Sequence, residues 1–282
     1  MSQELRLGGT LTQRHFMNRL HSPAVPPAPS AHTTKTSPAA SVVDPVIYQA
    51  VIRTASQSKL PYSLFTPLHY ERNYAYPLVV WLHGPHDDER QLHRVMPLLS
   101  MRNYAAIGPR GTCLYGDDQR GYHWGQHEGA LPAAEQRVLD CIDEAKQKLN
   151  VADNRVFIAG LNGGGTMAFR IGLRHPEKFA GVLSVGGPFP LGQRAFADLD
   201  RARRLPLFIA QGRDADTYSV DRVCEELRLF HSAGMNVSLR QYPCGDELTT
   251  KMLHDMDVWM MERVTGQTTQ TEETQAPSIE RN

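Results

Sequence analysis

The sequence predicts an α/β protein with a mostly parallel central sheet flanked by helices. Two observations lead to this fold class. Short apolar runs of strand length alternate with helix-length amphipathic segments from about residue 77 to residue 264. Most of the strand runs are continuously apolar, as expected for parallel strands that are covered on both faces. Since each parallel pair needs a crossover connection, the alternation itself favours a parallel sheet.

The individual elements follow from these patterns. Strands are expected where apolar residues are continuous or alternate, at 77–82, 105–107, 155–159, 181–185, 206–210 and 236–242. Helices are expected where apolar residues recur with helical spacing, at 133–149, 219–233 and 248–264, and after residue 166. On the last of the three numbered helices Leu248, Met252, Met256 and Trp259 share one face. The ligand site of such a sheet lies at the carboxyl ends of its strands.

The two ends of the sequence differ in composition from this region. Residues 21–45 are rich in Pro, Ser, Ala and Thr, and residues 267–282 are polar and aperiodic. Such segments bury too little apolar surface to offset the entropy lost on ordering. We therefore expect a disordered segment at 1–44, one folded domain at 45–266 and a disordered tail at 267–282.

Charge and hydropathy exclude several classes of protein. The 282 residues contain 30 Lys and Arg against 30 Asp and Glu, so the formal net charge is zero. This balance argues against binding to nucleic acid or to an anionic membrane through bulk electrostatics. No stretch approaches the roughly 20 consecutive apolar residues of a membrane helix. With no secretory signal in residues 1–20, a cytoplasmic location is expected.

A glycine-rich turn follows the strand at 155–159. Gly160, Asn162 and Gly163–Gly165 lead from this strand into a helix. A strand, a sharp glycine-flanked turn and a helix form the nucleophile elbow, G-x-S-x-G, of α/β-hydrolases. The sequence resembles the phospholipase/carboxylesterase and polyhydroxybutyrate-depolymerase-like esterases of that superfamily, from Val80–Gly84 to Gly245–Leu248. The resemblance implies an α/β-hydrolase domain.

The central residue of the elbow departs from the pattern. Asn162 stands where the resemblance implies the serine nucleophile, and an amide has no hydroxyl to attack a carbonyl carbon. A plain structural turn is an alternative, because Asn tolerates left-handed backbone conformations. A Rossmann turn fits less well, since an acidic residue about twenty positions further on is missing.

The other two triad positions implied by the resemblance are also altered. Asp246 stands in the place of the histidine, and a carboxylate is a weak base near neutral pH. Asp246 could instead cap the last helix together with Thr249. Ala215 stands at the acid position, where Asp214 or Asp216 could serve after a shift of one residue.

The oxyanion region shows a further change. Relatives take one donor from the residue after a His-Gly pair and another from the residue after the nucleophile. These positions are Pro85, after His83 and Gly84, and Gly163. Proline has no N–H to donate. The resemblance also implies that His83 and the aromatic segment Tyr122, His123 and Trp124 line the pocket.

No metal or cofactor site is expected. His83, His86 and His93 lie near Asp87–Glu89, but their spacing matches no known zinc motif. Two hypotheses remain for function. The first is a non-catalytic homologue that binds a small acyl or ester ligand, or a protein partner, through the old cleft. The second is an active carboxylic-ester hydrolase that uses other residues, for which Ser184 and Ser219 are the nearest serines to the strand ends.

Overall fold

The computed structural model describes residues 52–54, 60–114, 121–190 and 199–266. The protein separates into two units, Met1–Val42 and Val43–Asn282, and every described residue belongs to the second. The segments expected to be disordered, 1–44 and 267–282, lie outside the described residues.

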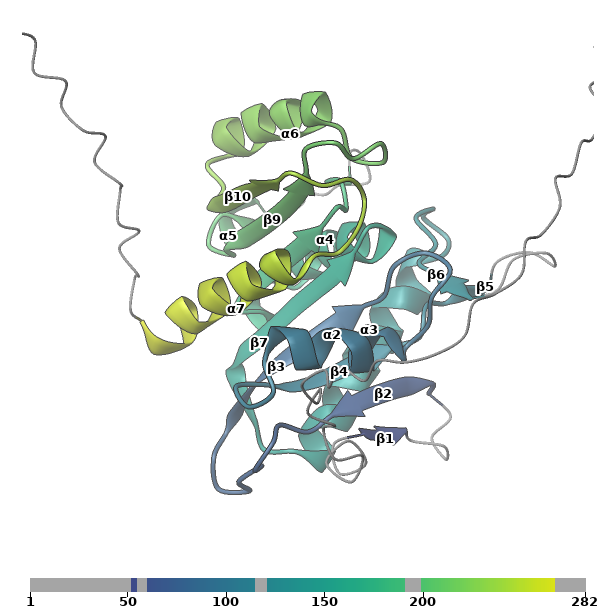
Figure 1. Cartoon of the computed structure of the whole chain (residues 1–282), viewed down its shortest axis with the longest axis vertical. Coiled ribbons are helices and arrows are strands. Elements are labelled where there is room, and N and C mark those ends of the chain that lie inside the picture. Colours follow the sequence, from purple (N-terminus) through teal and green to yellow (C-terminus); the bar gives the residue numbers. More distant parts are fainter. Residues whose placement is uncertain (1–51, 55–59, 115–120, 191–198, 267–282) are drawn as a thin grey trace, which may run out of the picture. The chain divides into compact units, whose positions relative to one another are not determined.

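The second unit is built on an eight-stranded sheet with the order β1-β2-β4-β3-β7-β8-β9-β10 (Figure 1). Its strands are β1 Ile52–Thr54, β2 Tyr62–Phe65, β3 Tyr76–Leu82, β4 Ala105–Pro109, β7 Val151–Leu161, β8 Gly181–Val185, β9 Leu207–Gly212 and β10 Val237–Tyr242. Six neighbouring strands of the sheet pair in parallel, in the order β4, β3, β7, β8, β9 and β10. Strands β1 and β2 join antiparallel at one edge. The predicted fold class, with all six predicted strands, is confirmed.

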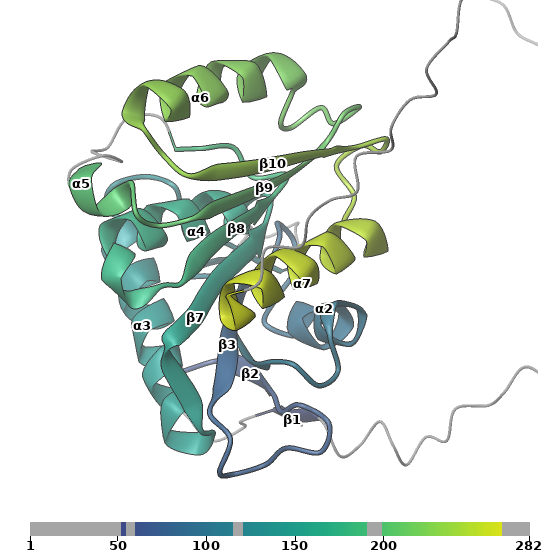
Figure 2. The same ribbon diagram turned by 90° about the vertical axis from the view of Figure 1, so that its left-hand side faces the viewer.

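Helices cover both faces of the sheet (Figure 2). They are α2 Gln91–Leu99, α3 Leu131–Lys148, α4 Gly163–Arg174, the 3₁₀ turn η1 Pro176–Lys178, α5 Leu199–Ala202, α6 Val220–Ala233 and α7 Thr250–Thr265. In Figure 2, α2 and α7 lie on one side of the sheet, and α3, α4 and α6 lie on the other. Strands β1 and β2 and helix α2 were not expected from the sequence, because each is short and α2 contains Pro97.

The alternation of strand side chains explains this layering. Leu78, Val80 and Leu82 of β3 belong to the core cluster that contains the α3 and α4 side chains, whereas Val79 and Trp81 belong to the cluster of α2 and α7. All five are buried, because successive strand residues point to opposite faces and both faces are covered. The continuous apolar run of β3 thus supplies two cores at once.

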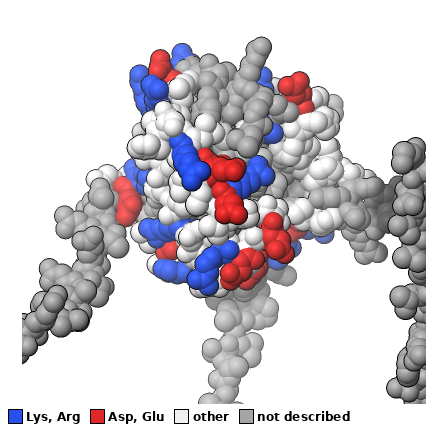
Figure 3. Space-filling view, turned by 90° about the horizontal axis from the view of Figure 1, so that it is seen from above, with Lys and Arg blue, Asp and Glu red and all other residues white. Residues whose placement is uncertain are grey.

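Two further features lie outside these layers. A short hairpin pairs β5 Cys113–Leu114 with β6 Tyr122–His123. Around α6, basic and acidic side chains are intermixed on the face seen in Figure 3. Helix α6 itself alternates in charge with Asp221, Arg222, Glu225 and Arg228. The described part of this face therefore carries no broad patch of one sign.

None of the described helices combines the length and apolar character that a bilayer crossing requires.

Candidate active site

The turn between β7 and α4 holds Asn162 in an unusual backbone conformation. Its φ is 48° and its ψ is −115°. The φ lies in the left-handed region but the ψ does not, so the residue is outside the left-handed well that Asn tolerates. Two backbone hydrogen bonds hold it, from Asn162 N to the Val185 carbonyl at 2.7 Å and from Thr166 N to the Asn162 carbonyl at 3.0 Å. The turn therefore has the strain of an elbow, which the alternative of a relaxed left-handed turn does not explain.

Close approach of backbones explains two of the glycines beside Asn162. A Cβ on Gly164 would overlap the carbonyl group of Leu82 at the end of β3, and a Cβ on Gly160 would overlap the backbone of Gly164. The start of α4 is thus pressed against the ends of β7 and β3. A Cβ on Gly163, by contrast, would meet nothing within 4 Å.

The side chain of Asn162 is only loosely engaged. Its Oδ1 is buried, lies against Gly186, and has no hydrogen-bond partner within the part of the protein that the structure describes. A buried polar atom without a partner is uncommon and costs free energy. The amide thus stands at the tip of the elbow with unused hydrogen-bonding capacity.

Asp246 does not cap the last helix. The cap of α7 is Thr249, whose side chain accepts a hydrogen bond from Met252 N at 3.3 Å. Thr249 directly precedes the first helical residue, whereas Asp246 lies three residues earlier, too far to reach the free N–H groups of the first turn. The carboxylate of Asp246 instead accepts hydrogen bonds from the backbone N–H groups of Asp216, at 3.2 Å, and of Thr217, at 3.3 Å. It therefore ties the loop after β10 to the loop after β9.

Ala215, which the sequence predicts for the acid position, places a buried methyl group there. Ala215 is buried and its N–H donates to the Gly212 carbonyl at 3.1 Å. Asp214 and Asp216 are both exposed, and the Asp214 carboxylate lies 3.5 Å from the guanidinium of Arg213. Neither neighbouring carboxylate replaces Ala215 in the interior.

His83 links two loops rather than standing free in a pocket. It is buried, and its Nε2 accepts a hydrogen bond from Gly111 N at 2.8 Å. Its Nδ1 must then carry the proton, which it donates to the Gly84 carbonyl at 2.7 Å. Burial lowers the pKa of His83, which keeps the ring neutral in this arrangement.

A glutamine that was not predicted from the sequence occupies a backbone N–H donor in the predicted oxyanion region. Gln91, on α2, is buried, and its Oε1 accepts from Gly84 N at 3.2 Å and from the Trp81 indole N–H at 2.7 Å. The N–H of Gly84 is thus already used, and Pro85 has none. Only tertiary contact reveals this role, because Gln91 belongs to no motif.

The aromatic segment lies against the same loop. Trp124 is buried, donates its indole N–H to the His83 carbonyl at 3.1 Å, and has its ring centroid 5.6 Å from that of His83. The guanidinium of Arg110 lies 4.7 Å from the centre of the Tyr122 ring, and Tyr122 and His123 are half-buried. That these side chains line a substrate pocket stays a prediction.

The two serines nearest to the strand ends have structural partners. Ser184 is fully buried and donates to the Gly187 carbonyl at 2.7 Å. Ser219 caps α6, and its side chain accepts from Arg222 N at 3.4 Å. Neither stands on an elbow.

Within the described ranges, no three His, Cys, Asp or Glu side chains are grouped to hold a metal ion.

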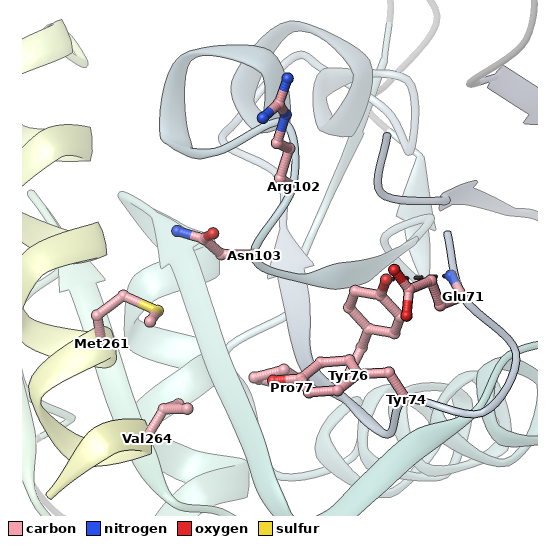
Figure 4. Close-up of a pocket in the computed structure, with 8 residues that line it drawn as sticks. All are labelled: Glu71, Tyr74, Tyr76, Pro77, Arg102, Asn103, Met261 and Val264. Atoms are coloured by element: carbon pink, nitrogen blue, oxygen red, sulfur yellow. Dashed lines mark hydrogen bonds between the residues drawn. The ribbon is translucent and has the colours of Figure 1, made fainter. Parts of the chain in front are cut away.

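A cavity of about 270 Å³ lies at the amino ends of the strands, opposite to the end that carries the elbow (Figure 4). Tyr76 and Pro77, at the start of β3, form its floor together with the neighbouring Tyr74. Met261 and Val264, near the end of α7, line another side. The elbow follows the carboxyl end of β7, which runs parallel to β3, so this cavity is separate from the candidate active site.

Comparison with known proteins agrees with this architecture. The sequence model of the family described as Phospholipase/Carboxylesterase matches residues 70–263. Among solved structures, the carboxylesterase from Mesorhizobium loti superimposes with a TM-score of 0.62 at 18% identity, over 74% of this protein and 98% of that one. The Bacillus cereus carboxylesterase gives a TM-score of 0.59 at 16% identity, over 78% of this protein and 100% of that one. At such identities the structures establish the fold alone.

Proposed function

The protein belongs to the phospholipase/carboxylesterase family. We propose that it is a member without serine-dependent hydrolysis. We propose further that it binds a small acyl or ester ligand beside the elbow, at the carboxyl ends of the strands. One observation carries the proposal. Asn162 occupies the strained elbow position, with a φ of 48° and a ψ of −115°, where the family mechanism needs a hydroxyl nucleophile.

The chemistry of acyl transfer explains why one residue has such weight. The nucleophile must be a group that an adjacent base can activate, and an amide at neutral pH offers no such atom. The position of the base also argues against hydrolysis. Asp246 stands there, and its carboxylate already accepts hydrogen bonds from two backbone N–H groups instead of activating a nucleophile. At the oxyanion position, Pro85 has no N–H and Gly84 donates its own to Gln91. The loss of one such donor typically costs about 3 kcal/mol of transition-state stabilisation.

The state of the Asn162 amide supports the binding part of the proposal. Its Oδ1 has no hydrogen-bond partner among the described residues, and an amide both donates and accepts. The carbonyl or ester oxygen of a ligand would accept from Nδ2 of this amide without any covalent step, whereas Oδ1 would take a donor. We assign the protein a cytoplasmic location, which suits its four free cysteines, Cys113, Cys141, Cys224 and Cys244.

Two measurements on the full-length protein test the loss of hydrolysis. Labelling with a serine-directed fluorophosphonate should give no stoichiometric adduct, and short-chain p-nitrophenyl esters should be hydrolysed no faster than in buffer. A stoichiometric adduct mapped to any serine would overturn the proposal and favour the alternative of an active ester hydrolase. Binding is tested separately, by a thermal-shift screen against acyl compounds and esters. A raised melting temperature supports the ligand class, and a screen with no shift contradicts it.

A rebuilt site tests whether the residue assignments are correct. Asn162→Ser, Ala215→Asp and Asp246→His together should restore ester hydrolysis, and each single change should not, because the three groups act as a unit. Adding Pro85→Gly should raise turnover further by restoring an N–H donor. Circular dichroism must show that each variant is folded. A folded quadruple variant with only background activity would contradict the assignments.

A further inference from the structure

The backbone of the elbow suits a reaction of Asn162 itself. Asn162–Gly163 is the only Asn-Gly pair in the sequence. In such a pair, the amide nitrogen of the glycine can attack Cγ of the asparagine and close a five-membered imide ring. The ring requires that the Cα–Cβ bond and the following C–N bond lie nearly in one plane, on the same side.

The ψ of Asn162 meets this requirement. About the Cα–C bond of an L-residue, the N and Cβ substituents lie roughly 120° apart, so a ψ near −120° eclipses Cβ with the next nitrogen. Asn162 has a ψ of −115°. Most residues have ψ values in the helical or extended wells and must leave them to react. Here the strained elbow already holds the backbone in the geometry of the ring, and only rotation about Cα–Cβ remains.

Within the described residues, no hydrogen bond ties Oδ1 of Asn162, and the Gly163 nitrogen has no partner inside its helix. Gly163 is the first residue of α4, so its N–H has no carbonyl partner within the helix. A Cβ at this position would meet nothing within 4 Å, so no other segment crowds the side-chain side of Gly163. On the other side, the Oδ1 of Asn162 is buried against Gly186 and is held by no hydrogen bond from the described residues, so packing alone opposes rotation of the amide.

We propose that Asn162 is a site of spontaneous deamidation in the folded protein. The Gly163 nitrogen loses its proton to hydroxide and attacks Cγ of Asn162. The N–Cγ bond forms, the Cγ–Nδ2 bond breaks, and Nδ2 leaves as ammonia after taking a proton from water. One water then opens the imide: breaking the new N–Cγ bond gives an aspartate at position 162, and breaking the original peptide C–N bond gives isoaspartate. Either product places a carboxylate at the elbow. The proposal does not depend on ligand binding at the site.

Ageing of the full-length protein near neutral pH tests the proposal. Peptide mass analysis should show position 162 converting to a mixture of aspartate and isoaspartate, while Asn236, which precedes Val237, keeps its amide. The folded protein should convert at least as fast as the same protein in urea, because the fold supplies the ψ that the unfolded state must search for. Retention of the amide in the folded protein, with conversion in urea, would overturn the proposal.

Gly163→Ala is the matched control. It adds a methyl group in open space at a residue without positive φ, so the fold should persist, which circular dichroism checks. The methyl group hinders the attacking nitrogen, and the variant should lose most of the conversion. Equal conversion in wild type and Gly163→Ala would exclude the imide route and contradict the proposal.

Discussion

The elbow and the paired loops after β9 and β10 hold their side chains in different ways. At the elbow, the backbone geometry is strained and fixed by hydrogen bonds to Val185 and Thr166, but the Asn162 side chain has no hydrogen-bond partner among the described residues. At the paired loops, the side chain is engaged, since the Asp246 carboxylate accepts from the N–H groups of Asp216 and Thr217.

This difference separates two ways in which a side chain at the predicted site can be held. A side chain that stabilises its own loop contributes to folding, and its position then resists change for a structural reason. A side chain that leaves a polar atom unsatisfied on a strained turn lowers stability, and such positions are found mainly at functional sites. The elbow, more than the paired loops, is therefore where a retained function is to be sought.

The largest expected effect tests how rigidly the elbow is built. Gly164→Ala should destabilise the protein by about 3 kcal/mol, because its Cβ would overlap the Leu82 carbonyl and the backbone cannot yield cheaply. Gly163→Ala, one residue away, should leave stability unchanged or slightly raised. Urea unfolding of both variants measures the difference. Equal stabilities would show that α4 can move away from β3, and the elbow would then not be rigid.

The next effect concerns the loop that follows β3. Gln91→Ala should cost about 2–3 kcal/mol, because the buried Trp81 indole N–H and the Gly84 N–H both lose their acceptor. Gln136→Ala removes an exposed glutamine that donates only to Asp140 within α3, and should cost less than about 0.5 kcal/mol. A Gln91→Ala variant as stable as Gln136→Ala would mean that water replaces the buried amide.

A smaller effect tests the engagement of Asp246. Asp246→Ala should destabilise the protein by about 1 kcal/mol, since it removes partly exposed hydrogen bonds of 3.2 Å and 3.3 Å. Asp216→Ala is the matched control, because that residue contributes only its backbone N–H to the contact and should change stability little. If Asp246→Ala were neutral, the contrast between the elbow and the paired loops would disappear.

The smallest effect is a pH dependence from the buried His83. Burial lowers its pKa below the ordinary 6.5, so the unfolded state binds the proton more readily than the folded one. The free energy of unfolding is therefore highest above pH 6.5. It declines as the pH falls through 6.5 toward the pKa of His83 in the folded protein. Between pH 7.5 and 6 the loss should stay below about 1 kcal/mol.

His83→Gln identifies the source of this pH dependence. Urea unfolding at a series of pH values should give a flatter curve for the variant than for wild type. A part of the slope should remain, because burial also lowers the pKa of His93. Parallel curves would show that His83 does not titrate differently in the folded and unfolded states.

Much of the sheet could be predicted from the sequence, because a buried parallel strand is visible as a local apolar run. The runs at 77–82, 155–159 and 181–185 are apolar almost throughout, and β3, β7 and β8 contain them. Strands β1 and β2 escaped prediction because they are short and a polar residue, Arg53 or Ser63, interrupts the apolar run of each. The pairing of β2 depends on β4, some forty residues further on.

The candidate site divides in the same way. The sequence by itself determined the family resemblance and showed an asparagine, which has no hydroxyl, at position 162, since both depend on residue identity within a short motif. Tertiary structure alone decided that Asp246 ties two loops thirty residues apart, that Gln91 takes the N–H of Gly84, and that Asn162 has a ψ of −115°. The physical reason is that hydrogen-bond partners and backbone strain are set by which segments the fold brings together, and no local pattern of residues records that arrangement.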